Sequence, residues 1–151
     1  MTTDAATDLP DEAHTRPPGV SDKTVEALGK LSEALEVVED ARGHLYAFHR
    51  MTGQADFALG DAARLLREAG HAELAERLET ELIGRNVIDG RWTFQIVEEY
   101  DDGYHAEFTA LEREARDQLV DGRRHLYEAE LKEARRSRGR SGHEARPNHY
   151  F

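Results

Sequence analysis

A stripe of large apolar residues recurs every three or four positions in the second half of this sequence. At about 100° per residue, positions with this spacing lie on one side of a helix. The stripe consists of Val97, Tyr100, Tyr104, Phe108, Leu111, Ala115, Leu119 and Leu126. A helix with one such face buries it against other helices, so the pattern predicts an all-α fold.

The residues before this stripe also follow a helical spacing. Ser21 is a candidate N-cap for a first helix, and Gly53 and Gly70 are candidate stops. The apolar positions of that first helix are Leu28, Leu31, Leu35, Val38 and Leu45. We expect an antiparallel bundle of about four helices, two long ones bracketing two short ones. The long helices are expected at about 21–51 and 92–135, and the short ones at about 55–69 and 72–83.

The two ends of the chain differ in composition from its middle. Residues 1–20 are acidic, hold three of the four prolines and contain few large apolar residues, so they predict a flexible arm. Residues 136–151 are basic and predict a flexible tail, although Tyr150 and Phe151 at its end are candidates for docking on a neighbour. The helical bundle domain is therefore expected at residues 21–135.

Composition excludes several classes of protein. The chain of 151 residues has no cysteine, which rules out disulfides, thiolate zinc sites and cysteine nucleophiles. A net charge of −11 argues against nucleic-acid binding, and no segment is apolar enough to predict a membrane span. The acidic N-terminus does not resemble a secretory signal, and 17 of the 20 basic residues are arginine, as in GC-rich genomes. These features predict a cytoplasmic bacterial protein.

The predicted helix lengths point to a partner. A helix of about 44 residues reaches roughly 66 Å, whereas one of about 31 residues reaches roughly 46 Å. Leu119, Leu126 and Leu131 in the overhang would stay exposed unless the helix folds back near Gly122 or a second copy covers it. We expect a homodimer.

Residues 85–92 are the best candidate for a surface that binds a partner. Arg85, Asn86, Arg91 and Trp92 gather there with an aspartate and a glycine that indicate a turn. Such a mixture suits recognition of a protein or a small anion, and no phosphate loop or serine elbow accompanies it. We therefore predict a non-enzymatic protein that acts by protein-protein interaction. The alternative is a capped turn in which Trp92 covers the end of the bundle.

A metal site is the rival hypothesis. His49 falls within the apolar face of the first helix, and His105 flanks the stripe of the last helix with Asp101 four residues before it. Antiparallel helices could bring these three residues together, and neutral imidazoles with a carboxylate bind zinc, nickel, iron or manganese. In the alternative, structural interpretation, each histidine is satisfied by a neighbouring carboxylate or carbonyl, and no cofactor is bound.

Two further features concern the interior of the bundle. Arg42 falls within the apolar face of the first helix, where an unpaired charge would be costly. We predict a buried ion pair with Glu98, and Asp101 and Asp102 are alternative partners; an anion-binding role is the other option. Tyr100, Tyr104 and Phe108 could also line a small-ligand pocket against the first helix, although such spacing is more typical of a core.

Overall fold

The structure, a computed structural model, describes residues 8–146. Its helices are α1 (Asp22–Glu68), α2 (Ala72–Glu81), α3 (Thr93–Tyr100), α4 (Ala106–Val120) and α5 (Leu126–Arg135). A short 3-10 helix, η1 (Glu12–His14), precedes α1, and a π-helical turn, η2 (Asp101–His105), joins α3 to α4 in one 28-residue helix. Within the described residues there is no strand, and the extended pairing is an isolated bridge between Ile88 and Arg91. The predicted all-α class is confirmed.

The described chain divides into two compact units. Unit 1 comprises residues 8–37 and 107–146, and unit 2 comprises residues 38–106. The first turns of α1 belong to unit 1 and its remaining turns belong to unit 2.

The first helix does not end near Met51, as we expected from Gly53. α1 is 47 residues long and includes both Gly53 and the segment expected to form a separate short helix. Glycine in a helix interior costs only about 1 kcal/mol relative to alanine, and the helical face continues through Leu59 and the buried Ala63. α1 ends instead before Gly70, whose φ of +89° and whose neighbours' hydrogen bonds form the left-handed C-cap that the sequence predicts.

Two glycines of α1 are expected to respond in opposite ways to alanine. A Cβ at Gly53 meets nothing within 4 Å, so Gly53→Ala should raise the free energy of unfolding by about 0.5–1 kcal/mol. A Cβ at Gly29 lies 2.8 Å from the Cβ of Tyr127, so Gly29→Ala should lower it by about 1–2 kcal/mol despite the better helix propensity. Urea denaturation of both variants measures the sign of each change in the free energy of unfolding. Destabilisation by Gly53→Ala would contradict an uninterrupted α1.

The last predicted helix, in contrast, is interrupted. The break lies near Gly122, where the sequence analysis gave a fold-back of the helix as one alternative. α4 ends at Val120, and Asp121 and Gly122 adopt φ of +54° and +73°, which turns the chain out of the helix. α5 then begins at Leu126, whose side chain is buried. The expected 92–135 helix is therefore two helices, and the overhang from which we expected a homodimer does not form.

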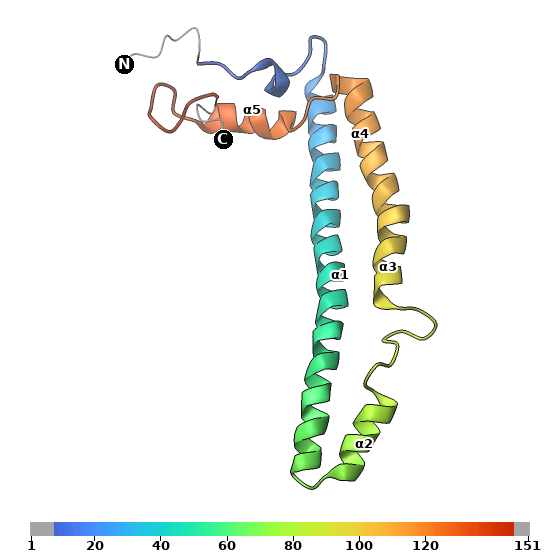
Figure 1. Cartoon of the computed structure of the whole chain (residues 1–151). Coiled ribbons are helices and arrows are strands. Elements are labelled where there is room, and N and C mark those ends of the chain that lie inside the picture. The colour runs from blue at the N-terminus through green and yellow to red at the C-terminus, as the bar shows by residue number, and fades with distance from the viewer. Residues whose placement is uncertain (1–7, 147–151) are drawn as a thin grey trace. The chain divides into compact units, whose positions relative to one another are not determined.

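Unit 1 is built around a small apolar core. α4 lies beside the first turns of α1 and runs in the opposite direction (Figure 1). Where α1, α4 and α5 meet, Val25, Leu28, Val120 and Leu126 form a buried cluster. Val20 and Ala115 are partly buried and pack against this cluster. The core therefore draws on three helices of this unit.

Parts of the predicted arm and tail also contact unit 1. Arg16 binds Glu130 of α5 at 2.7 Å, and the buried Arg136 binds Asp8 at 2.7 Å. The flexibility of the two ends remains a prediction, and residues 1–7 and 147–151, including Tyr150 and Phe151, lie outside the described residues.

Unit 2 is a set of antiparallel helices with little buried apolar surface. α2 folds back along the end of α1, and α3 lies beside the middle of α1 (Figure 1). The buried apolar residues of this unit are Ala63, Ala75 and Val97. By contrast, the exposed large apolar residues in it are Tyr46, Phe48, Met51, Phe57, Leu65, Leu74, Leu82, Val87, Ile88, Trp92, Phe94 and Tyr104. Unit 2 therefore exposes more of its large apolar residues than it buries completely.

Candidate functional site

Residues 85–92 form an exposed corner between α2 and α3, which we call the Arg85–Trp92 corner. Every residue in it is exposed, and Trp92 keeps 55% of its surface accessible. The Trp92 ring contacts the ring of Phe94 at a centroid distance of 5.2 Å, and Phe94 is itself exposed. Trp92 therefore lies on the surface and does not cover the end of the bundle.

Local hydrogen bonds hold this corner in one conformation. The amide of Arg91 donates to the carbonyl of Ile88 at 3.2 Å, and Gly90 between them has a φ of +78°. The amide of Trp92 donates to the side-chain oxygen of Gln95 at 2.9 Å, which caps the start of α3. Arg91 forms an ion pair with Glu99. Because these bonds hold the backbone of the turn before binding, the corner loses less backbone conformational entropy when a partner binds.

Arg85 is the basic group of the corner that remains available. Its guanidinium makes no hydrogen bond or ion pair with any residue from 8 to 146, whereas Arg91 is engaged by Glu99. Hollows of about 350 and 420 Å³ lie on either side of it, and Leu82 and Arg85 line both. Asn86 and Val87 line the first hollow, next to Thr52 and Leu59 of α1. The corner therefore combines hollows with apolar lining and the guanidinium of Arg85, which is unpaired within the described residues.

Arg42 does form an ion pair, but with Asp101 and not with Glu98. Its Nε and Nη2 donate to the two carboxylate oxygens of Asp101 at 2.7 and 3.1 Å, and the hydroxyl of Tyr46 donates to the same carboxylate at 2.8 Å. Arg42 is one third exposed, so the pair is half-buried instead of lying in a core. The guanidinium of Arg42, followed by the Tyr46 hydroxyl, lowers the pKa of Asp101 to about 2.

The three candidate metal ligands do not converge. Nδ1 of His49 lies 2.7 Å from the hydroxyl of Thr93, and Nε2 of His105 lies 2.5 Å from the carboxylate of Glu39. Asp101 is already occupied by Arg42 and Tyr46. Within residues 8–146, no group of three or more histidine, aspartate or glutamate side chains is placed to hold a metal ion. The geometry agrees with the structural interpretation of both histidines.

The aromatic residues of the long helix do not enclose a ligand site. Tyr100 and Tyr104 contact each other with ring centroids 5.9 Å apart, across the start of the π-helical turn η2. Tyr104 is 58% exposed, so its ring cannot form the wall of a closed cavity. The side chains act as surface and half-buried packing groups.

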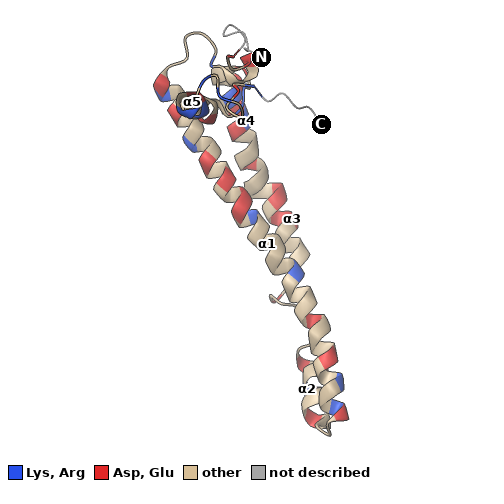
Figure 2. Ribbon diagram, turned by 90° about the vertical axis from the view of Figure 1, so that its left-hand side faces the viewer, with Lys and Arg blue, Asp and Glu red and all other residues tan. Residues whose placement is uncertain are grey.

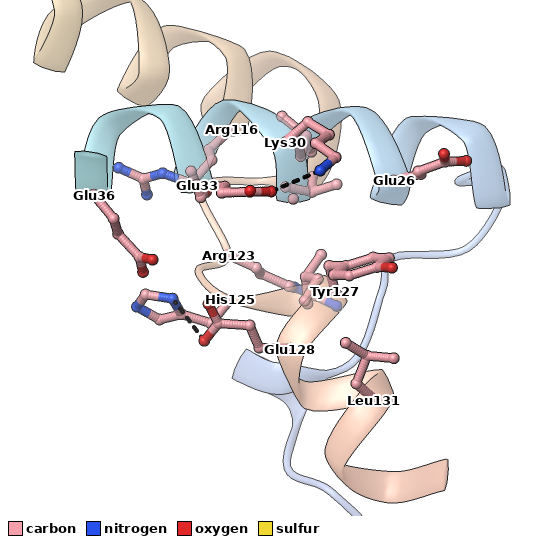
Figure 3. A pocket seen from close by; sticks show the side chains of 15 residues that line it. Glu26, Lys30, Glu33, Glu36, Arg116, Arg123, His125, Tyr127, Glu128 and Leu131 are labelled. Carbon is pink, nitrogen blue, oxygen red and sulfur yellow. Dashed lines mark hydrogen bonds and ion pairs between the residues drawn. The ribbon is translucent and has the colours of Figure 1, made fainter. Parts of the chain in front are cut away.

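Sequence reasoning did not predict a pocket of about 330 Å³ in unit 1 (Figure 3). α1 and α5 form its walls, and Leu28, Val120 and Leu126 contribute apolar lining. Several of its charged side chains have partners: Lys30 binds Glu33 at 2.8 Å, and His125 lies 3.7 Å from Glu128. Arg116 binds Glu112 of α4 at 2.7 Å. Since these groups already have partners, the pocket offers weaker recognition chemistry than the Arg85–Trp92 corner. The close approach of Gly29 to Tyr127 beside it depends on tertiary packing that spacing does not reveal.

No protein-family model, curated protein or solved structure matches this chain. In the part of the chain that the structure describes, none of the helices has the length and apolar character required to traverse a bilayer. The function must therefore be argued from the surface itself.

Proposed function

We propose that this chain is a non-enzymatic, cytoplasmic interaction protein that binds a protein partner through the Arg85–Trp92 corner. The observation that carries the proposal is an exposed tryptophan at the end of a hydrogen-bonded turn, in the same corner as Arg85, which has no side-chain partner among residues 8–146. Tryptophan and arginine dominate the binding energy of many protein interfaces. The surrounding Val87, Ile88 and Phe94 extend the apolar contact area.

The chemistry of the corner also specifies its partner. The guanidinium of Arg85 presents a planar fork that matches a carboxylate, and the two hollows beside it accept apolar side chains. The partner should therefore carry an acidic residue flanked by apolar ones. Elsewhere the helices of unit 2 are rich in Asp and Glu (Figure 2), which disfavours an acidic partner away from the corner.

Affinity purification with quantitative mass spectrometry tests this proposal. We compare the wild-type chain with Trp92→Ala and Arg85→Ala, and use Phe57→Ala as the control. Phe57 is 83% exposed, more than any other large apolar residue between residues 8 and 146, and it lies outside the corner. A partner should be retained by the wild type and by Phe57→Ala. The purified partner should lose about 30-fold or more in affinity for Trp92→Ala, equivalent to about 2 kcal/mol. Equal binding of the same proteins by wild type and Trp92→Ala would overturn the proposal.

A homodimer remains a proposal as well. Its original basis, the overhanging last helix, is absent because the chain turns at Asp121 and Gly122. A different surface of unit 2 supplies a new basis.

A further inference from the structure

A second apolar stripe runs along α1 within unit 2. Its positions are separated alternately by three and four residues, which is the heptad spacing of a coiled coil. They are Ala41, His44, Phe48, Met51, Ala55, Ala58, Ala62 and Leu65. All are exposed except the half-buried Ala62, and Phe48, Met51 and Leu65 are 41%, 64% and 54% exposed. We call this set the open stripe.

The open stripe is separate from the face of α1 that contacts α3 and η2. Arg42, Tyr46 and His49 make those contacts, and they lie about 100° or more around the helix from the open stripe. On one flank, Leu45, Thr52 and Leu59 are half-buried, so the apolar surface continues from the interior of unit 2 to the open stripe. The open stripe is therefore the outward continuation of this unit's own packing.

A second helix is the partner that this spacing requires. An apolar repeat of 3.5 residues stays in register with another helix that winds around it. The segment between Arg50 and Asp61 has Asp56 as its one charged residue, and α1 includes a largely uncharged stretch in Figure 2. Unit 2 fully buries only Ala63, Ala75 and Val97 among its apolar residues, whereas twelve of its large apolar residues are exposed. Covering the open stripe would remove Phe48, Met51 and Leu65 from water.

The open stripe is complementary to itself when two copies run in opposite directions. Its central residues, Phe48 and Met51, lie on either side of a midpoint about which Ala41 mirrors Ala58 and His44 mirrors Ala55. A two-fold axis at this midpoint places Phe48 against the partner's Met51, which is a favourable sulfur-aromatic contact made twice. It also places each His44 opposite a small alanine. A parallel pair would instead set Phe48 against Phe48 and His44 against His44.

We infer that unit 2 forms an antiparallel homodimer through the open stripe of α1. This inference goes beyond the proposed function and does not rest on it. The two surfaces meet at Ala55, which belongs to the open stripe and lines the hollow of about 350 Å³ beside Arg85. Met51 and Trp92 each belong to one surface alone, so substitutions at these residues test the two proposals separately. Failure of one proposal therefore leaves the other standing.

The oligomeric state of the full chain provides the first test. Light scattering after size exclusion should give a dimer for the wild type at micromolar concentration. Met51→Glu should raise the dimer dissociation constant by about 100-fold or more, because it places a charge at the centre of the contact. Phe57→Glu is the matched control, since Phe57 is apolar and exposed but lies off the open stripe, and it should remain dimeric. A monomeric wild type would overturn the inference.

Disulfide cross-linking tests whether the two α1 helices run in opposite directions. The variants keep Phe48 and Met51 at the centre of the open stripe. The natural chain has no cysteine, so introduced pairs are unambiguous. Positions 41 and 58 of one copy are about 25 Å apart along the helix and cannot join within that copy. The double variant Ala41→Cys, Ala58→Cys should therefore oxidise to a covalent dimer, while Ala41→Cys alone should not. Cross-linking of Ala41→Cys alone to the same extent would overturn the antiparallel arrangement.

Discussion

Replacing Arg136 by alanine should destabilise unit 1 more than any other single substitution considered for this chain. The Arg136 side chain is fully buried and donates to the carboxylates of Glu133 and Asp8 at 2.6 and 2.7 Å. It also donates to the backbone carbonyl of His143 at 3.2 Å. Arg136 lowers the pKa of both carboxyl groups. Its removal leaves the largely buried Asp8 carboxylate without its ion-pair partner, and leaves Glu133 with only the exposed Arg138.

The expected result is a fall of about 10 °C in the Tm of Arg136→Ala, measured by circular dichroism at neutral pH. Arg138→Ala is the matched control. Arg138 binds the same residue, Glu133, at 2.9 Å, but its side chain is 68% exposed, so its loss should change the Tm by no more than about 2 °C. Equal effects of the two substitutions would show that residues 136–146 are not held against Asp8 in solution.

Local spacing predicted that the chain is helical and predicted several of its turns. The apolar period that begins at Leu28 continues through α1, and Gly70 ends that helix by the left-handed conformation that glycine adopts easily. The Asp-Gly pair at residues 89 and 90 likewise predicted the turn of the Arg85–Trp92 corner. These features depend on neighbours in the sequence, which is why the sequence reveals them.

The interruptions of helices were harder to predict. Gly53 and Gly122 are the same residue in similar polar surroundings, yet the first is helical and the second turns the chain. The difference is tertiary: α2 packs along α1 beyond Gly53, whereas Leu126 gains burial in the core of unit 1 only if the chain turns at Gly122. Glycine propensity of about 1 kcal/mol is too small to decide between these outcomes.

The register of the two helices explains why the three candidate metal ligands lie apart. Pairing Arg42 with Asp101 fixes which levels of α1 and α3 face one another. His49 is two turns further along α1, about 10 Å beyond that level, where it meets Thr93. His105 lies toward the opposite end and meets Glu39. The sequence places all of these residues on facing sides of two helices, but the choice of Asp101 over Glu98 depends on packing.

The Arg42–Asp101 pair should make the stability of unit 2 dependent on pH in the acid range. The folded state lowers the pKa of Asp101 from 3.8 to about 2, so the ionised carboxylate is favoured by folding. This contribution is complete above about pH 4 and is lost as the pH falls towards 2. Asp101→Asn removes the charge at every pH and leaves Arg42 without its carboxylate. The variant should therefore be less stable than the wild type by about 2 kcal/mol at pH 7, and the difference should shrink between pH 4 and pH 2.

Urea denaturation followed at Trp92 and by circular dichroism measures this difference across the pH range. Asp102→Asn serves as the control, because Asp102 is the adjacent aspartate and its side chain is exposed. It should change the free energy of unfolding by less than about 0.5 kcal/mol. Tyr46→Phe removes only the hydroxyl that donates to Asp101 at 2.8 Å, so its effect should be intermediate. A wild-type and Asp101→Asn difference that stays constant from pH 7 to pH 2 would mean that packing, and not the charge of Asp101, links α1 to the turn η2.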